Sequence, residues 1–592
     1  MAAMKIDPIT LEVVQNGLLT ITKEMDFVIA RTARSVLWQE SGDYSTAILA
    51  PNGDMISQGP NGIPVHLGTM PQSVQHALAK VGVDTLEPGD VIWNNDPYSG
   101  SNHVPDVLLV KPIFHDRLVV AISAVRGHWL DIGGSTPGSY STINRDIYGE
   151  GFRLPPTKLF RRGVINEDLF NAILANVRLA EERRADFEAQ MAGLNLGERR
   201  VMTLCEKYGR ETFSNCLDEI LRRSEALVRL EIRKMPNGVY RASDILDGDE
   251  IDRKQINVNV TVTIRDEDLE IDFTGTDPQA TGGINASYAV TCSATYYTIK
   301  TLTNPEIPAN SGSYRPIKVI APEGSVVNPI FPAPVVQGNH ETGSRVVDVL
   351  YRAFAQAIPE KVIAGVTGSA SAIVVGGETY TDNARKKRYL QLQPIDGGRG
   401  ACIGSDGINA IRCGVINAKN QPIEIMESRS PIIIDRWELA ADSGGAGQYR
   451  GGCAVTMEFR IKNGTAIVTT LSDRGTTGPY GLFGGDEGRK CGLSLSHDGT
   501  ANALFSKSTV LMQAGDVFRF EAAGGGGVGN PLLRDAAAVI KDVENGYVTV
   551  AAAKKVYGLD IDPQTLRVAP TPERRAVEAA SPKSGVLRGA AT

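Results

Sequence analysis

Histidine is scarce in this sequence, so the surroundings of each one are informative. Only seven histidines occur among the 592 residues. His103 precedes Asp106 by three positions in a segment punctuated by Pro and Gly, and His128 directly follows Gly127. Two imidazoles and one carboxylate suit Zn, Mn or Fe and leave coordination positions open for water or substrate. A metal held in this way can polarise a carbonyl or lower the pKa of a bound water to about 7.

The spacing alone leaves a second interpretation open. An H-x-x-D pattern is common by chance, and it also fits a surface histidine beside an aspartate that caps a turn. Asp43 is a candidate fourth ligand, although its connection to the other residues rests on less. His66 and His340 fit structural or surface roles better than metal ligation, but the polar loop that carries His340 is also a candidate for contact with a substrate.

The neighbouring elements predict that the candidate ligands meet. Apolar runs at 106–114 and 117–125 indicate two buried strands. The loop that carries His103 and Asp106 can turn both side chains toward one point. His128 comes just after the second run, where the edge of a sheet would present it to the same cleft.

Glycine-rich segments offer only weak evidence for nucleotide binding. The sequence contains neither G-x-x-x-x-G-K-[ST] nor G-x-S-x-G. Residues 524–529 match G-x-G-x-x-G, but Asn530-Pro531 follows at once, so we favour a tightly turned loop over a dinucleotide site. Segment 442–452 is also rich in glycine, and we favour a tight loop there too. The alternative is that Arg450 contacts an anion.

Hydrophobic periodicity divides the chain into regions of different predicted secondary structure. Over 166–234 Pro is absent and apolar residues recur three and four apart, which predicts two or three helices broken near Gly193 and Gly209. Residues 256–264 alternate polar and apolar and pair with 269–273 as a hairpin. The other predicted elements are helices over 5–37, 68–82, 286–303, 344–358 and 532–543, a hairpin over 44–58, a strand over 89–94, short strands over 360–530, a small β/α piece over 547–558 and a loose tail over 572–592.

These elements predict a mixed α and β, multidomain fold with an N-terminal α/β part, a central helical segment and a β-rich C-terminal half. The length suits several structural units. We expect an N-terminal α/β domain over 1–165 that carries the metal-site motifs, followed by a helical segment over 166–235 and a second α/β segment over 236–345. A β-rich domain over 346–531 and a C-terminal helix with a tail over 532–592 complete the chain.

Composition excludes several classes of protein. Lys and Arg total 61 against 68 Asp and Glu, a net charge of −7 that argues against nucleic-acid and anionic-membrane partners. No apolar run approaches the roughly 20 residues that span a bilayer, and residues 1–10 show no secretory signal. The seven cysteines are odd in number and never form C-x-x-C, which fits reduced thiols in a cytoplasmic protein.

Several motifs in order along the chain resemble the hydantoinase B/5-oxoprolinase family. The resemblance extends over nearly the whole sequence, from Asp7 to Gly558, and a series of motifs is far more specific than any one of them. The residues that carry it are Ser41-Gly42-Asp43-Tyr44-Ser45, Asn95-Asp96-Pro97-Tyr98, His103-Val104-Pro105-Asp106, Gly127-His128, Asp272-Phe273-Thr274-Gly275, Asp442-Ser443-Gly444-Gly445, Tyr449-Arg450-Gly451-Gly452 and Gly524-Gly525-Gly526-Gly527.

The resemblance implies a chemistry that the spacing alone does not. Similar proteins work beside a hydantoinase A type subunit that binds ATP and Mg and phosphorylates an amide or enol oxygen, and the B-type subunit completes the reaction at a divalent metal. Carried over by motif, the metal ligands are His103, Asp106 and His128, with Asp43 less surely. Asp131 and Glu341 are our suggestions for the acid or base that moves protons.

Three functions are compatible with these motifs. The first is the metal-bearing subunit of an ATP-dependent hydrolase of cyclic amides (hydantoin, lactam or oxoproline-like), in which a metal-bound water opens the ring. The second is a subunit of an ATP-dependent ketone carboxylase of the acetone or acetophenone type. The third is a scaffold that only stabilises the ATP-binding partner, against which the intact ligand set argues. The motifs do not separate the first two.

Overall fold

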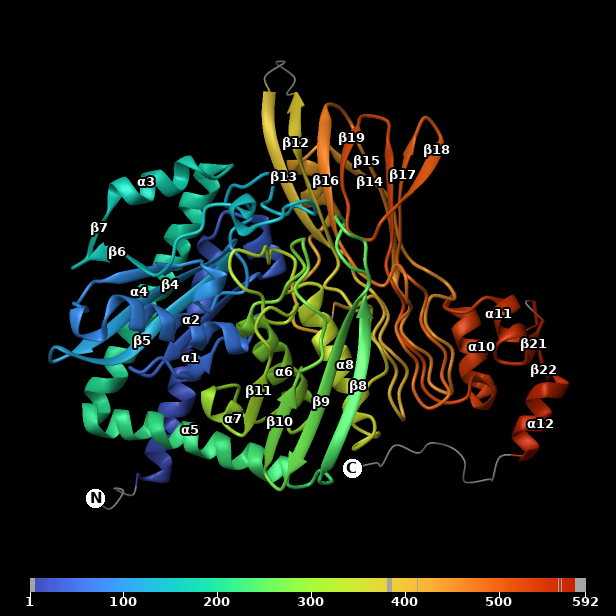
Figure 1. Cartoon of the computed structure of the whole chain (residues 1–592), viewed down its shortest axis with the longest axis horizontal. Helices are drawn as coiled ribbons and strands as arrows, with labels where there is room; N and C mark the ends of the chain where they lie inside the picture. Colours follow the sequence, from blue (N-terminus) through green and yellow to red (C-terminus); the bar gives the residue numbers. More distant parts are fainter. Residues whose placement is uncertain (1–5, 381–385, 413, 563, 566, 581–592) are drawn as a thin grey trace.

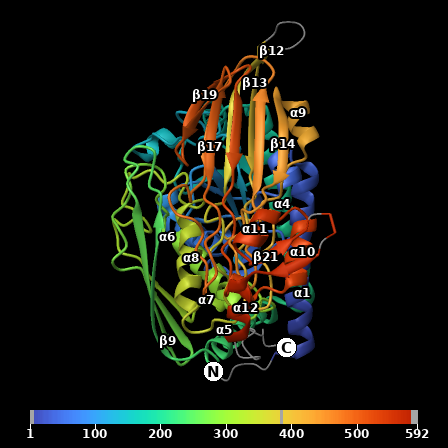
Figure 2. The ribbon, with the colours of Figure 1, turned by 90° about the vertical axis from the view of Figure 1, so that its right-hand side faces the viewer.

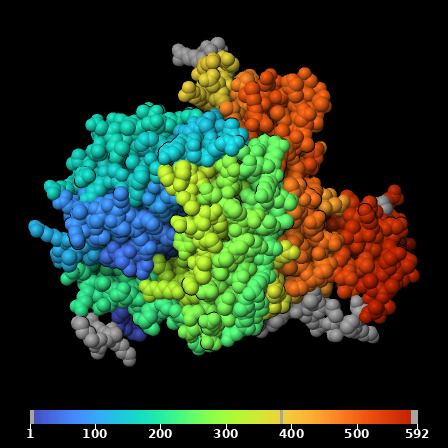
Figure 3. Space-filling model, viewed as in Figure 1, coloured from blue at the N-terminus to red at the C-terminus, as the bar shows by residue number. Residues whose placement is uncertain are grey.

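The computed structural model describes residues 6–380, 386–412, 414–562, 564–565 and 567–580. It confirms a mixed α and β, multidomain architecture, with an N-terminal part, a central part and a β-rich C-terminal part that follow one another across the molecule (Figures 1 and 3). Within these residues no helix is long and apolar enough to cross a membrane. The six described cysteines are free thiols.

A seven-stranded antiparallel sheet forms the N-terminal part. The order of its strands is β2-β1-β5-β4-β3-β6-β7, so that β5 and β4 lie inside the sheet. The strand bounds are β1 Tyr44–Leu49, β2 Met55–Gln58, β3 Val91–Asn94, β4 Asp106–His115, β5 Leu118–His128, β6 Thr157–Arg161 and β7 Val164–Ile165.

Both faces of this sheet are buried. On one face Leu108 packs in a core with α2 (His66–Val81), and on the other Val107 packs in a core with α1 (Pro8–Thr32) and α4 (Ala180–Tyr208). Alternate residues of one strand point to opposite faces, and both sets here must be apolar. That requirement explains the unbroken apolar runs that predicted β4 and β5.

The helical segment contains α3 (Glu167–Ala175), α4 and α5 (Arg210–Ile232). The predicted break at Gly209 is confirmed, whereas the one at Gly193 is wrong because α4 continues through it. A Cβ on Gly193 would lie 2.9 Å from the Ile29 side chain, so this glycine lets α1 approach α4.

The predicted first helix is too long. Instead of continuing to residue 37, α1 ends at Thr32, and a short π-helical turn follows at Leu37–Ser41. The side chain of Asp186 on α4 accepts the backbone N–H groups of Arg34 and Ser35 at 2.9 and 3.0 Å. These contacts hold the chain away from the helix axis and turn it toward β1.

The central part is a four-stranded sheet whose core is shared with its neighbours. α6 and α8 belong to the same hydrophobic core as β9 and α2, and this core extends from Ala47 to Ala418 across the predicted boundary at 345/346. The sequence analysis did not predict β8 as a separate strand. The bounds are β8 Gly238–Leu246, β9 Ile256–Arg265, β10 Asp268–Asp272, β11 Ile317–Ile320, α6 Tyr288–Leu302, α7 Ser311–Tyr314 and α8 Thr342–Phe354.

Two sheets pack face to face in the C-terminal half (Figure 2). Val375, Phe459 and Phe518 fill the core between them. One sheet has the order β13-β12-β16-β19 and the other β14-β15-β20-β17-β18. Their bounds are β12 Ala372–Tyr380, β13 Lys386–Pro394, β14 Ile432–Leu439, β15 Val455–Ile461, β16 Thr465–Leu471, β17 Gly492–His497, β18 Thr500–Leu504, β19 Thr509–Gln513 and β20 Val517–Glu521, with α9 at Ile423–Arg429.

Glycine-rich segments below this sandwich form a bundle of extended chains (Figure 1). We call segments 397–407, 443–453, 478–488 and 523–529 the glycine bundle. Backbone hydrogen bonds join them laterally, for example Gly525 N to Gly452 O at 2.9 Å and Gly445 N to Gly525 O at 2.7 Å. A Cβ on Gly525 would lie 2.0 Å from the Arg399 carbonyl oxygen, so the chains can approach only because side chains are absent.

The C-terminal part contains more structure than the sequence predicted. Residues 572–592 were expected to be a loose tail, but α12 forms over Pro572–Ala580 and residues 581–592 lie outside the described part. Arg574 anchors α12 by donating to the carbonyls of Arg534 and Tyr557 at 2.6 and 2.9 Å. The remaining elements are α10 Ala536–Glu544, α11 Val550–Lys555, β21 Leu559–Ile561 and β22 Val568–Pro570.

Candidate metal centre

The ends of β4 and β5 bring the predicted ligands together. Asp106 is the first residue of β4, His128 is the last residue of β5, and the two are paired in the ladder. His103 is attached to the same end because Asp106 N donates to its carbonyl at 3.2 Å. Gly127 is needed beside them, since a Cβ there would lie 2.1 Å from the Trp38 ring, whose N–H donates to the His128 carbonyl.

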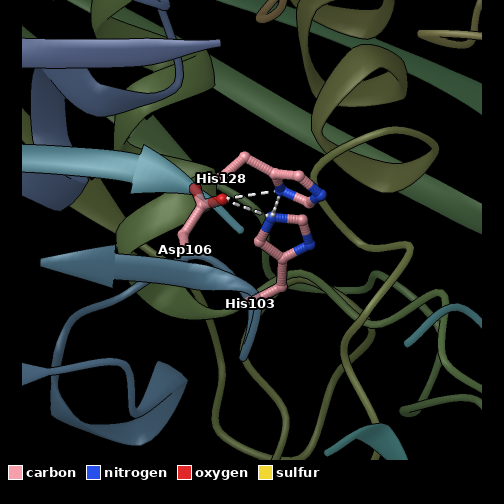
Figure 4. Close-up of side chains that lie close together, drawn as sticks. All are labelled: His103, Asp106 and His128. Carbon is pink, nitrogen blue, oxygen red and sulfur yellow. Dashed lines mark hydrogen bonds and ion pairs between the residues drawn. The ribbon is translucent and has the colours of Figure 1, made fainter. Parts of the chain in front are cut away.

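Three donor atoms converge at this point (Figure 4). Asp106 Oδ1 lies 2.8 Å from His103 Nε2 and 2.9 Å from His128 Nδ1, and the two nitrogens are 3.2 Å apart. All three side chains are buried. The sequence therefore predicted correctly that these residues meet.

The hydrogen bonds around His103 fit a cation at the centre. His103 Nδ1 lies 3.0 Å from the Val336 carbonyl, which can only accept, so Nδ1 carries a proton. A neutral His103 then points the lone pair of Nε2 at Asp106 Oδ1, a contact that is repulsive unless a proton or metal cation is shared between them. Two imidazoles and a carboxylate arranged in this way fit Zn, Mn or Fe.

A buried carboxyl group fixes the backbone that holds His103. Glu150 Oε1 accepts the N–H groups of Val335 and Val336 at 2.7 and 2.8 Å. Burial raises the pKa of Glu150 to about 8, although these two hydrogen bonds oppose the rise. By fixing the backbone at Val335 and Val336, Glu150 positions the Val336 carbonyl that His103 Nδ1 contacts.

The second oxygen of Asp106 is held from the opposite side. His66 Nε2 lies 3.1 Å from Asp106 Oδ2, and Asn102 Nδ2 donates to the same oxygen. His66 Nδ1 in turn meets Ser45 Oγ at 2.6 Å. Such contacts fix the orientation of a ligating carboxylate. The sequence analysis assigned His66 a structural or surface role and did not connect it with Asp106, because 40 residues separate the two.

The charges of these groups depend on one another. Burial alone would raise the pKa of Asp106, but His103, His128 and His66 outweigh it and hold that pKa well below its usual range. Burial would lower the pKa of His103, but Asp106 outweighs this and raises it. Burial lowers the pKa of His66. Asp106 is therefore a carboxylate at neutral pH and His66 is a neutral donor toward it.

Tyr140 and His340 form a wall beside the three donors. The Tyr140 hydroxyl lies 3.0 Å from His340 Nε2 and 3.5 Å from His103 Nδ1. His340 Nδ1 meets the Ala370 carbonyl at 2.9 Å. Burial, followed by the charge of Arg412, holds the pKa of His340 well below its usual range. The sequence analysis offered His340 as a candidate for substrate contact, and it did not identify Tyr140.

Asp43 lies next to the centre but outside the cluster of three donors. Its carbonyl accepts the backbone N–H of His128 at 3.1 Å. Burial raises the pKa of its carboxyl, partly offset by the charge of His128. The residue is half-buried, in contrast to the three donors.

The two candidate proton-transfer residues have different surroundings. Asp131 accepts the N–H groups of Gly133, Gly138 and Arg178 and forms an ion pair with the Arg178 guanidinium at 3.0 Å. These contacts engage both of its oxygens in holding a loop, so the arrangement does not support its proposed role. Glu341 is buried next to His340, and neither of its oxygens reaches a hydrogen-bond partner in the described part of the chain. Burial raises its pKa to about 8.

The glycine-rich candidates lie in the glycine bundle, as the loop interpretation predicted. Residues 524–529 are bonded to neighbouring extended chains and are not followed by a phosphate-binding helix. Arg450 donates to Asn409 and Gly451 and pairs with Asp542 at 3.3 Å. Its guanidinium is therefore occupied within the fold, which does not support an anion contact.

A sequence profile of the hydantoinase B/oxoprolinase family matches residues 7–531. This chain belongs to that family. A Pseudomonas protein provisionally named as the B-type component of a D-/L-hydantoinase is 33% identical over 94% of this chain and 96% of its own length. The beta chain of the caprolactamase of Pseudomonas jessenii is 31% identical, with 94% and 97% covered.

Solved structures of two enzymes share the fold of this family member. The crystal structure of the ATP-dependent caprolactamase of Pseudomonas jessenii superimposes with a TM-score of 0.89 at 30% identity, covering 98% of this chain and all of that one. Nucleotide-free acetone carboxylase gives 0.88 at 19% identity, with 97% and 82% covered. The latter likeness concerns the fold alone.

Proposed function

We propose that this chain is the metal-bearing subunit of an ATP-dependent hydrolase of cyclic amides. The observation that carries the proposal is the buried cluster of His103, Asp106 and His128 in a chain related along nearly its whole length to the B-type component of a hydantoinase and the beta chain of a caprolactamase. The substrate would be a hydantoin, a lactam or an oxoproline-like ring.

The cluster is suited to the difficult step of such a reaction. An unactivated amide is a poor electrophile at neutral pH, and phosphorylation of its oxygen creates a good leaving group. A divalent metal (Zn, Mn or Fe) held by the three donors would supply Lewis acidity and a nucleophile near pH 7. His66 keeps Asp106 oriented, and Glu150 does the same for His103. Asp43, which is half-buried, is available as a further ligand.

Nucleotide chemistry is assigned to a second subunit. The sequence contains no Walker-type phosphate loop, and its one G-x-G-x-x-G match belongs to the glycine bundle. Two relatives are named as single components of enzymes that contain more than one kind of chain. The partner would be a hydantoinase A type chain that binds ATP and Mg and phosphorylates the amide oxygen.

Glu341 is the better of the two candidates for moving a proton. With its pKa raised to about 8 by burial, most of the group is protonated at pH 7 and can give a proton to a departing amine. It adjoins His340, which contacts the Tyr140 hydroxyl beside His103. Asp131, engaged by Arg178, is not retained in this role.

The test is substrate-stimulated ATP hydrolysis by this chain purified with its ATP-binding partner. Hydantoins, lactams, 5-oxoproline and ketones are compared with and without bicarbonate, and ring-opened product is quantified against ADP. We expect a cyclic amide to stimulate ATP hydrolysis without bicarbonate, with ring opening lost in His128→Ala. Turnover only with a ketone plus bicarbonate would establish the carboxylase instead, and turnover unchanged by His128→Ala would leave the metal centre without a role.

A further inference from the structure

Arg412 is a half-buried arginine whose guanidinium lacks an anionic partner among the described residues. Its Nη1 and Nη2 donate to the carbonyls of Ser371 and Ala370, both at 2.8 Å. No carboxylate oxygen among the described residues lies within 4.0 Å of it. Nε is buried without any hydrogen-bond partner in the same part of the chain. A guanidinium normally satisfies its fork of donors with a carboxylate or a phosphate.

One carbonyl connects Arg412 with the metal centre. Ala370 O accepts from Arg412 Nη2 and also meets His340 Nδ1 at 2.9 Å. His340 Nε2 contacts the Tyr140 hydroxyl at 3.0 Å, and that hydroxyl lies 3.5 Å from His103 Nδ1. The guanidinium therefore belongs to the same wall of the site as Tyr140.

Neighbouring groups only partly compensate the positive charge of Arg412. Burial lowers its pKa, and the nearby carboxyl groups, Asp396 first, only partly oppose this. A negative ligand beside it would remove the remaining cost of a buried positive charge.

A second arginine near the centre, Arg126, is less accessible than Arg412. Arg126 is fully buried and donates to the hydroxyls of Thr69 and Ser73 on α2. Arg412, by contrast, is half-buried, as Asp43 is. Arg412 is thus the more accessible of these two arginines.

We propose that Arg412 is the anion-binding residue of this centre and holds a phosphate oxygen of the activated substrate beside His103, Asp106 and His128. The proposal rests on the proposed function for the source of the phosphate. A purely structural arginine would tie the 370–371 backbone to its loop and would have no effect on anion affinity, so the two roles are separable by binding.

The test uses the full chain alone, loaded with Co²⁺ as a spectroscopic probe of the three donors. Inorganic phosphate is titrated by calorimetry and by the visible spectrum of the cobalt. We expect Arg412→Gln to weaken phosphate binding by about tenfold or more, the usual size of one lost charge-assisted contact, with cobalt content unchanged. Arg352→Gln is the matched control, because Arg352 also donates to a carbonyl, that of Ser243, but is exposed on α8.

A second variant keeps the test decisive if Arg412→Gln fails to fold. Arg412→Lys retains the charge without the fork, so we expect a folded protein with an intermediate phosphate affinity. Equal phosphate affinity in the parent and in Arg412→Lys, or no phosphate binding by the parent, overturns the proposal. Binding of acetate in place of phosphate would overturn the phosphate assignment. The binding test contains no partner subunit, ATP or cyclic amide. Its outcome is therefore independent of whether the proposed hydrolase activity is observed.

Discussion

Asp106 and His128 face each other as direct partners across the β4–β5 ladder. Their meeting depends on the far end of the hairpin. A bulge between Ile113 and Phe114 shifts the register by one residue, and the two-residue turn at Asp116 and Arg117 has φ values of 49° and 65°. A slip of one residue would turn every side chain of a strand to the opposite face, so turn and bulge together place His128 opposite Asp106.

Removing His128 should remove the metal. His128→Ala leaves one imidazole and one carboxylate, which is too few donors for tight binding of Zn, Mn or Fe. We expect the bound metal, measured by elemental analysis of the purified chain, to fall below about a tenth of the parent value. His76→Ala is the control, because His76 is exposed on α2 and its Nδ1 contacts only the Gln72 carbonyl. Normal metal content in His128→Ala would exclude His128 as a ligand.

His66 should tune metal affinity without being a ligand. Its Nε2 orients Asp106 through Oδ2, the oxygen turned away from the other two imidazoles. We expect His66→Ala to weaken metal binding by about 10–100-fold, while one metal per chain still binds at saturation. Competition with a chromophoric chelator measures both quantities. If saturating metal no longer restores full occupancy, His66 is itself a ligand and the centre has four protein donors.

The meeting of the three candidate ligands was predictable because their signals are local. His103 and Asp106 are three residues apart in a polar loop, and His128 ends a strongly apolar strand. A hairpin with a two-residue turn joins Asp106 to His128, so the pairing of its two neighbouring strands brings them together. The family resemblance then gave each of them a role.

The surroundings of the ligands were not predictable from local patterns. Glu150, His340 and Arg412 lie on segments far apart in the chain, and hydrogen bonds through Val336, Tyr140 and Ala370 connect them with His103 only in the folded structure. Gly193 was misread for a similar reason. Its role is to let α1 approach α4, and a contact between two helices leaves no signal in the periodicity of one of them.

Glu150 should make the stability of the chain depend on pH. Its pKa rises from an ordinary value of 4.5 to about 8 on folding, mainly through burial. The folded state therefore keeps a proton that the unfolded state loses. This contribution is fully present below pH 4.5 and is lost as the pH rises through 8.

The substitution Glu150→Gln isolates this effect. It keeps an oxygen that can accept from Val335 and Val336 but cannot ionise. We expect the fall in melting temperature of the metal-free chain between pH 5 and 9 to be smaller than in the parent. Glu150→Ala should instead lower the melting temperature at every pH, because two buried N–H groups lose their acceptor. An identical pH dependence in Glu150→Gln and the parent would contradict the raised pKa.

The glycine bundle should tolerate no side chain at its centre. In Gly525→Ala the new Cβ would lie 2.0 Å from the Arg399 carbonyl oxygen, and backbone on both sides would have to move. We expect the free energy of unfolding to fall by about 3 kcal/mol, seen as a melting temperature several degrees lower. Gly17→Ala is the control within α1, where a Cβ meets only the flexible Leu204 side chain at 3.3 Å. That change should be neutral or stabilising by up to about 1 kcal/mol, since Ala favours a helix over Gly. Equal melting temperatures for both variants would mean that the extended chains are packed more loosely than their hydrogen bonds indicate.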